Sequence, residues 1–486
     1  MAAGIAAVAA LSLALVLGLL FGSPIGAGDN GDGARLYCGA GLVPDTPSHS
    51  ASWQGGVVLD FVRATPCRDP QPSSAAVLFR SVAGGHGPFS LTKLGWLYVL
   101  LIFLATLLAA WALQARGRWR ALLVLPPLVP LLEPDFARMF ISTFGKPAGL
   151  LGAYLMLCGV AVIAVTRVED GFERLSALVL VGGGGVVAGL AKIGFLPLFV
   201  LAVLVCAGTG ARLGPGRWWS GRLVGPALAV LLAVEIIGPV RAALGWQDRH
   251  FAVVNAVNVV YTLDLVEMPG TAPDLGLPAQ AQAGAGRGFF SPGPGGLIGV
   301  DVVRHDPAGI KERVWGGLLE RPAVLARVVG IALQSSNGRA LEYLPHAPWT
   351  PASAPPTYVD AGNQQEAFQL WLDEMSLPWW PSLAVLLGVA AGVVASLPRR
   401  RWKTRYGLVA GVAAVGALGI AVLAVLGDGY FEIAKHTWLA GYLLDTAALS
   451  IGVVVVPALV RWVRLRRAGR ARAGSDVDRT GTVSTR

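Results

Sequence analysis

Long apolar blocks are the feature of this sequence that most restricts its fold. Several runs of about 20 residues carry almost no charge, and a helix of that length crosses about 30 Å of hydrocarbon. Hydrophobic residues make up 54% of the chain and charged residues only 14%, whereas a soluble domain carries about 25% charged residues. We therefore predict an all-α polytopic membrane protein.

Ten stretches fit this description, so the predicted fold is a bundle of about ten transmembrane helices with a large external loop region. The third is short and contains Pro126, Pro127 and Pro130, and we expect it to be kinked or half-embedded. Prolines leave some carbonyl groups without their helical hydrogen bonds, and inside the membrane only the protein interior offers these groups other partners. The ten stretches lie near residues 4–22, 94–115, 119–132, 147–166, 175–190, 193–210, 223–240, 381–397, 406–427 and 438–460.

The first stretch raises the question of a signal peptide. It has no Lys or Arg before its apolar run, which is poor for the charged region that begins a signal peptide. The small residues "GAG" at 26–28 leave cleavage open. We predict that the stretch is retained as a span.

The basic loops indicate the orientation. Five Arg-rich segments share one face, because they fall on alternate sides of consecutive spans: 116–120, 166–174, 212–222, 398–405 and the tail from Arg461. The positive-inside bias makes this face cytoplasmic. We expect a multi-pass plasma-membrane protein with a cytoplasmic N-terminus and the lipid bilayer as its partner. The net charge of +10 then reflects topology and indicates no nucleic-acid partner.

The spans divide the chain into four parts: an N-terminal transmembrane region (1–240) that includes the first external loop (23–93), an external, mostly helical segment (241–380), a C-terminal transmembrane region (381–460), and a basic cytoplasmic tail (461–486). The polar and basic composition of the tail predicts disorder.

Local patterns add three expectations. Residues 306–334 predict two short helices at the membrane surface, broken near Pro322, and residues 355–381 predict another helix that ends in Trp379 and Trp380. The glycine run "VGGGG" at 181–185 indicates close helix packing.

The four cysteines separate into two pairs. Cys158 and Cys206 lie within spans and are expected to pack. Cys38 and Cys67 share the first external loop, where oxidation is allowed, and a disulfide between them is left open. No Cys or His spacing indicates zinc.

Ionisable residues are scarce, and those near the external ends of spans come from sequence-distant places at one membrane depth. Lys192 is the most informative, because its turn between two apolar spans has no neighbouring charge. It either snorkels or faces an anionic group in a cavity. The set is Asp29, Asp32, Arg35, Glu133, Asp135, Arg138, Lys146, Lys192, Asp264, Asp428, Glu432, Lys435 and His436.

Carboxylates, lysines and a histidine at the outer boundary of a helix bundle suit sugar transfer from a lipid-phosphate carrier. A carboxylate acts as general base on an acceptor hydroxyl, and basic side chains neutralise the departing phosphate. An ion-coupled transporter would instead place its ionisable residues near the midplane, where Glu235 is the clearest example here.

Six pieces of the sequence, in order from "DNGDGARLYCGAGL" after the first span to "GDGYFEIAKHTWLAGYLLD" at the last, carry a family resemblance. They resemble the GT-C glycosyltransferases, and within them the bacterial glycan biosynthesis hexose transferases (WsfD-like). The opening "DNGDGARLYCGAGL" after the first span is similar to that group's "NGD" segment, and "GLAKIGFLPL" to its lysine segment. The other pieces are "EPDFARMFISTFGKPAGLLG", "NAVNVVYTLDLVEMPGTAPDLGLPAQAQAGAG", "NGRALEYL" and "GDGYFEIAKHTWLAGYLLD". The chain departs from the pattern at Lys146, Gly194 and Glu432, where the family usually has Glu, Gln and Asp.

This resemblance implies a polyprenyl-phosphate hexose donor and a cell-surface glycan acceptor. It implies a catalytic base at Asp32, or else at Asp29, because GT-C enzymes use an aspartate of the first external loop. The candidates for the donor phosphate are Arg35, Lys192, Lys435 and His436, and those for the acceptor are Glu133, Asp135 and Asp428. A divalent cation, Mg or Mn, held through Asp29 and Asp32 is left open.

Simpler roles stay open beside these. Asp29 lies in "DNG", a strong turn signal, and Glu133 and Asp135 fit a cap for the helix after Pro134. Three functions remain: a GT-C glycosyltransferase, a transporter or flippase of lipid-linked sugars, and a non-catalytic accessory subunit.

Overall fold

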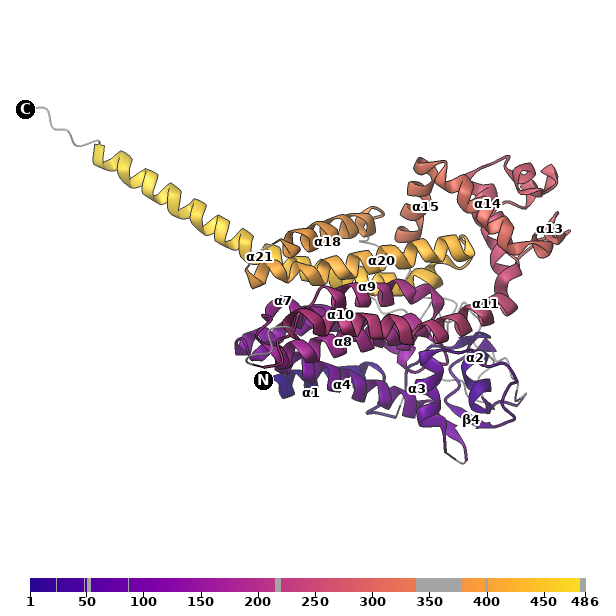
Figure 1. The fold of residues 1–486 in the computed structure, drawn as a ribbon, viewed down its shortest axis with the longest axis horizontal. Helices are drawn as coiled ribbons and strands as arrows, with labels where there is room; N and C mark the ends of the chain where they lie inside the picture. The colour runs from indigo at the N-terminus through magenta and orange to yellow at the C-terminus, as the bar shows by residue number, and fades with distance from the viewer. Residues whose placement is uncertain are drawn as a thin grey trace, which may run out of the picture.

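The computed structural model describes residues 1–22, 24–47, 49, 54–85, 87–214, 220–337, 377–397 and 401–480. This part of the chain is an all-α bundle with short strands near one end only (Figure 1). Six of its helices are long and apolar enough to cross a membrane, so the protein is a multi-pass membrane protein. They are α4 (Thr92–Gln114), α7 (Lys146–Val165), α8 (Gly171–Ala191), the continuous stretch Gly221–Glu267, the stretch Trp402–Asp428 that includes α20 (Gly407–Asp428), and the first part of α21 (Ile433–Pro457).

The count of about ten spans is not confirmed, although apolar helical segments occur at all ten predicted places. Four of them are short: α1 (Ala2–Val16), α5 (Leu125–Leu131) with the preceding turn η2 (Arg118–Val124), α9 (Leu196–Ala207) with η4 (Ile193–Phe195), and α18 (Trp380–Ser396). At 1.5 Å per residue, a helix of about 12 to 17 residues covers about 18–26 Å, less than the hydrocarbon thickness.

The proline-rich third segment, expected to be kinked or half-embedded, is not one continuous α-helix. It begins as a 3₁₀ turn and continues as the short helix α5. The Tyr442 hydroxyl donates to the carbonyl of Pro127 (2.9 Å), and the Tyr406 hydroxyl donates to that of Leu123 (2.6 Å). Side chains from α20 and α21 therefore satisfy its carbonyls inside the protein.

Helix α7 forms the centre of the bundle, with nearly all of its residues buried. It packs closely on α8, as the glycine run predicts. A methyl group on Gly184 would lie 2.5 Å from the carbonyl oxygen of Gly152, so only glycine permits this approach.

The predicted boundary at residue 240 is wrong as a helix end. Helix α10 (Ser220–Glu235) is followed almost directly by α11, which runs from Ile237 to Asn258 and carries the chain past the bundle (Figure 1). The apolar pattern fades after residue 240 because one face of α11 is polar, but the helix does not stop there.

Beyond α11 the external segment is mostly helical in its described part. It contains the π-helical turn η5 (Val259–Asp264), α12 (Leu265–Glu267), η6 (Ala272–Leu275), η7 (Ala279–Gly284), α13 (Val300–His305), α14 (Pro307–Leu319), α15 (Pro322–Gln334) and η8 (Ser335–Asn337). The break near Pro322 is confirmed. The helix expected at 355–381 and the piece "NGRALEYL" lie almost wholly outside the described residues; Trp380 begins α18.

The first external loop forms a small cap of helices and antiparallel strands. Its sheets are β1–β3 and β2–β4–β5, and the disulfide Cys38–Cys67, left open by the sequence, is formed. Its elements are β1 (Asp29–Asn30), α2 (Ala34–Tyr37), η1 (Cys38–Ala40), β2 (Leu42–Pro44), β3 (Gln54–Gly55), β4 (Asp60–Arg63), α3 (Ser74–Ala83) and β5 (Phe89–Ser90). The strands are the exception to the all-α prediction.

The two ends of the bundle differ in content. The N-terminus lies at one end, where α21 leaves the bundle, and α2, α3 and α13 to α15 lie at the other (Figure 1). The Arg-rich loops meet at the first end: Arg116 pairs with Asp170, and Arg405 donates to the carbonyl of Thr166 (3.5 Å). The predicted sharing of one face by these loops is consistent with this arrangement.

The expected disorder of the tail from Arg461 is wrong for most of its length. Helix α21 (Ile433–Thr480) continues through it and extends away from the bundle (Figure 1). Arg and Ala, which are strong helix formers, make up ten of the 20 residues from Arg461 to Thr480, and this helix propensity explains why the segment is helical although it has few apolar residues.

Candidate functional site

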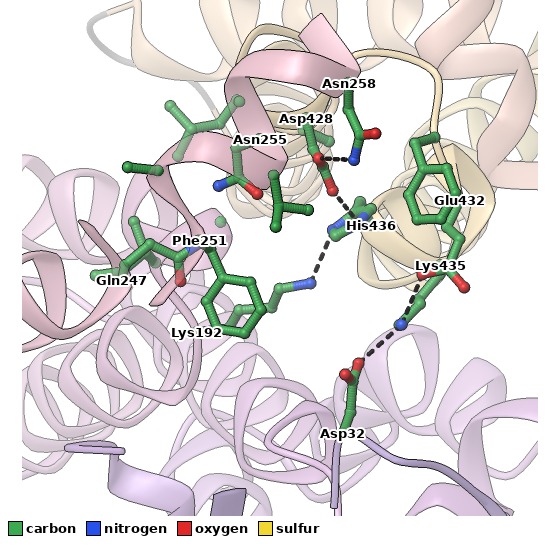
Figure 2. A pocket seen from close by; sticks show the side chains of 18 of the residues that line it. Asp32, Lys192, Gln247, Phe251, Asn255, Asn258, Asp428, Glu432, Lys435 and His436 are labelled. Atoms are coloured by element: carbon green, nitrogen blue, oxygen red, sulfur yellow. Dashed lines mark hydrogen bonds and ion pairs between the residues drawn. The ribbon is translucent and has the colours of Figure 1, made fainter. Parts of the chain in front are cut away.

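A cavity of about 920 Å³ lies at the end of the bundle that carries the external segments. Its walls come from the first external loop, the start of α7, the turn between α8 and α9, α11, α14, and the turn between α20 and α21. The cavity brings together eight of the thirteen residues in the predicted set: Asp32, Arg35, Lys146, Lys192, Asp428, Glu432, Lys435 and His436. Figure 2 shows five of these side chains directed toward one another.

The turn after the first helix presents Asp32 to the cavity and keeps Asp29 behind it. Asp29 is buried, and its Oδ1 accepts hydrogen bonds from the backbone N–H groups of Gly31 (2.8 Å) and Gly33 (2.9 Å). The Thr143 hydroxyl donates to its other oxygen (3.2 Å). Asp29 does not line the cavity, so the turn-forming role that the sequence left open is the one the geometry supports.

Burial affects the pKa of Asp29 strongly. It raises the pKa to about 6, against the backbone hydrogen bonds from Gly33 and Gly31, which lower it. Asp29 therefore changes its charge near neutral pH, whereas a surface aspartate does not.

Asp32 has the opposite environment. Its carboxylate contacts the Lys435 ammonium (2.8 Å) and the Arg35 guanidinium (2.8 Å). Burial alone would raise its pKa, but the charges of Lys435 and Arg35 outweigh burial and lower it well below the ordinary value. The Arg35 guanidinium also lies 4.3 Å from the ring centre of Phe251, which fixes it over α11. Asp32 is therefore a carboxylate at any physiological pH.

A chain of hydrogen bonds runs along the opposite wall (Figure 2). Lys192 Nζ lies 2.9 Å from His436 Nδ1, His436 Nε2 lies 3.0 Å from Asp428, and the Asn258 amide donates to Asp428 (2.8 Å). An ammonium cannot accept a hydrogen bond, so Nδ1 is the acceptor and His436 carries its proton on Nε2. Burial and the charge of Lys435 lower the pKa of Lys192 to about 8.

The turn between α20 and α21, with the residues on either side of it, brings Asp428, Glu432, Lys435 and His436 to this wall. Glu432 has a φ of 46°, an unfavourable conformation for a residue with a side chain, and Gly429 has a φ of 63°. Thr262 accepts a hydrogen bond from the Tyr430 backbone (2.8 Å), which ties the turn to the external segment. Glu432 in turn contacts Lys435 (2.7 Å), so Lys435 lies between two carboxylates.

Sequence reasoning missed one whole wall of the cavity. Gln247, Phe251, Asn255 and Asn258 lie on one face of α11 and line the cavity (Figure 2). Their spacing of three to four residues is the helical period, and this polar stripe was the signal that could have found them. The search for ionisable residues passed over it because the stripe consists mostly of amides.

Five residues of the predicted set do not line the cavity: Asp29, Glu133, Asp135, Arg138 and Asp264. Glu133 begins the short helix α6 (Pro134–Ala137), and Asp135 is buried in its first turn, 3.8 Å from Arg138. Asp264 is buried against the Thr271 hydroxyl (2.5 Å). Neither Glu133 nor Asp135 lines the cavity: Asp135 is buried in the first turn of α6, and Glu133 is half-buried just before it.

The residues expected to hold a divalent cation do not fit one. The oxygens of Asp29 accept hydrogen bonds from N–H and O–H donors, and those of Asp32 face Lys435 and Arg35. Across the described ranges, no group of three or more His, Cys, Asp and Glu residues has metal-binding geometry.

One comparison with known proteins gives a match. Residues 2–240, just under half of the chain, are similar to the family model of the YfdI N-terminal transmembrane domain. No curated protein and no solved structure matches the chain. The similarity agrees with the six apolar helices, and both support a multi-pass membrane protein.

Proposed function

We propose that this protein is a membrane glycosyltransferase of the GT-C type, which transfers a hexose from a polyprenyl-phosphate donor to a hydroxyl of a cell-surface glycan. The observation that carries the proposal is the position of Asp32. Its carboxylate faces a cavity at the end of the membrane-spanning helices, beside a group of cations. A donor whose lipid tail lies in the bilayer presents its phosphate at this depth. The similarity of residues 2–240 to a transmembrane domain supports the membrane setting.

Asp32 is suited to act as the general base. The acceptor oxygen forms a bond to C1 of the hexose, the bond from C1 to the phosphate oxygen breaks, and the acceptor proton passes to Asp32. Lys435 and Arg35 hold the carboxylate ionised and fixed in direction. Their charges also make it a weaker base, so we expect the acceptor to displace one of these contacts when it binds.

Lys192 is suited to receive the departing phosphate. His436 occupies one of its three N–H donors, and Asp428 fixes the ring of His436. The remaining two donors are available to phosphate oxygens in the cavity. Charge that develops on the leaving group therefore meets a cation that is already oriented.

The polar face of α11 is suited to hold the sugar. Gln247 and Asn255 line the cavity, and no hydrogen bond within the described residues engages their amides. Amide groups both donate to and accept from hydroxyl groups, and a ring such as Phe251 packs against the apolar face of a hexose.

The clustered ionisable residues favour this function over transport. They lie at one end of the bundle, whereas a transporter generally binds its ions near the bilayer midplane. The cavity also contains a carboxylate held at one wall and an anion-binding lysine at another, an arrangement that transport alone does not need.

The test is a transfer reaction with purified protein. The protein in lipid nanodiscs is incubated with a panel of polyprenyl-phosphate hexoses and glycan fragments, and release of polyprenyl phosphate is followed by mass spectrometry. We expect release from one donor with the wild-type protein and none with Asp32→Asn. A protein that releases nothing, but moves a lipid-linked sugar across a liposome bilayer, would be a flippase.

A further inference from the structure

Lys146 is a buried cation with no role in the mechanism above. It is the first residue of α7, and only 4% of its surface is exposed. It lines the same cavity as Asp32, and its ammonium has no hydrogen-bond partner within the described residues. The ring of Phe144 lies beside it, with the ring centre 4.9 Å from Nζ.

The other cations close to Asp32 are all engaged. Lys435 contacts two carboxylates, Lys192 contacts His436, and Arg35 contacts Asp32. An unpaired ammonium removed from water costs several kcal/mol, and such groups in membrane proteins commonly mark ion or substrate sites. Lys146 therefore differs from its neighbours in a way that a bound anion would explain.

Two further features of the backbone favour an anion at this place. Helix α7 has 20 residues and starts at Lys146, which lines the cavity, so the positive end of its dipole lies at the cavity wall. A methyl group on Gly145 would lie 2.8 Å from the carbonyl oxygen of Ala191. The backbones of Gly145 and Ala191 therefore lie against each other. Lys146 follows Gly145 and Lys192 follows Ala191, so the two lysines extend from neighbouring points of the backbone.

We propose that Lys146 and Lys192 together form the binding site for the phosphate group of the substrate, and that Lys435 stays with Asp32 as a positioning residue. The group that this site would bind is a phosphate ester that carries at least one negative charge. This inference rests on the proposed function in one respect only, namely that the phosphate belongs to a lipid carrier.

The experiment measures binding without transfer. Wild-type protein in detergent is titrated with farnesyl phosphate, inorganic phosphate and farnesol, and affinity is measured by calorimetry. We expect Lys146→Met to weaken farnesyl phosphate binding by about 10-fold or more, because a charge-assisted hydrogen bond contributes about 1.5–3 kcal/mol. Lys146→Arg should restore most of the affinity for farnesyl phosphate. The affinity for farnesol, which has no phosphate, should be the same in the wild type and in both variants.

The matched control is Lys93→Met. Lys93 is also in the first turn of a helix, α4, but it is exposed and does not line the cavity, so its loss should leave affinity unchanged. Thermal melting shows whether the variants fold, and Lys146→Gln replaces Lys146→Met if the latter does not. Competition by inorganic phosphate at similar concentration would identify free phosphate as the ligand, and its failure to compete would identify the lipid ester.

Two outcomes overturn the inference: unchanged affinity of Lys146→Met for farnesyl phosphate, or no binding of phosphate or its ester by the wild type. Failure of the proposed function is separate from both. A protein that binds farnesyl phosphate through Lys146 but transfers no hexose keeps the phosphate site and loses the transferase activity.

Discussion

The two ends of the helix bundle use the same kinds of charged side chain for different purposes. At the Arg-rich end, Arg174 is buried and donates to the carbonyl of Thr166 (2.9 Å) and to that of Gly210 (3.3 Å), and Arg116 pairs with Asp170. These guanidinium groups close the end of α7 and tie loops together. At the cavity end, the charges of Asp32, Lys192 and Lys435 surround an open volume.

This difference shows that burial of charge alone does not identify a site. Both ends contain buried charged side chains. Among the described residues, the cavity end also has the ammonium of Lys146, which lines the cavity and has no hydrogen-bond partner. Each of the following predictions tests whether the two ends really differ in function, from the largest expected effect to the smallest.

The largest effect is expected from Asp32→Asn. Removal of a general base lowers the rate by about 10² to 10⁴-fold, so transfer from the lipid-linked donor should fall by this factor. The variant should still melt near the wild-type temperature, because Asp32 lies on the cavity wall with 24% of its side chain exposed.

Asp29→Asn is the matched partner of that variant. The amide oxygen of asparagine still accepts from the N–H groups of Gly31 and Gly33, so the turn should persist and activity should stay within about 10-fold of wild type. If Asp29→Asn lowers transfer activity as much as Asp32→Asn does, the positions of the two carboxylates do not identify which of them is the general base.

Lys192→Met should lower kcat/KM by about 10 to 100-fold, the value of one or two charge-assisted hydrogen bonds to phosphate. Because the pKa of Lys192 is lowered to about 8, the wild-type protein should lose affinity for the proposed donor as the pH rises above 8. Lys192→Arg keeps its charge to higher pH and should shift this loss upward. A pH profile identical in both proteins would assign the titration to another group.

Arg174→Met probes the opposite end. It removes hydrogen bonds to buried carbonyls at the end of α7, so we expect a loss of about 1–3 kcal/mol in the free energy of unfolding, with transfer activity within about twofold of wild type. Denaturant melts and the transfer assay on one preparation measure both quantities. A large loss of activity in well-folded protein would mean that the two ends are coupled.

The smallest effect concerns the pH dependence of stability. The pKa of Asp29 is about 6 in the folded protein and about 3.8 unfolded, so between these values the folded state binds more protons and stability falls as the pH rises. Wild-type protein should therefore lose roughly 1–2 kcal/mol relative to Asp29→Asn between pH 4 and 6.5. A difference that is constant over this range would contradict the burial of an ionisable Asp29.

Much of the candidate site was predictable because its residues are charged in a chain that has few charges. Asp32, Arg35, Lys192, Lys435 and His436 stand out at the ends of apolar blocks, and all five line the cavity. The amides of α11 were not predictable in this way, since Gln and Asn are common on helix surfaces. Glu133 and Asp135 met the same sequence criterion as Asp32, and only the folded structure shows that they do not line the cavity.

The sequence alone determined that this chain spans a membrane several times and that its ionisable residues gather at span ends, because hydrocarbon excludes charge and water-exposed backbone. It also located the helices, the break near Pro322 and the close packing at Gly184. The tertiary structure decided which of two aspartates three residues apart faces the cavity. That choice depends on hydrogen bonds from Gly31, Gly33 and Thr143 to Asp29, and Thr143 is more than 100 residues away. A contact between such distant residues exists only once the bundle has folded.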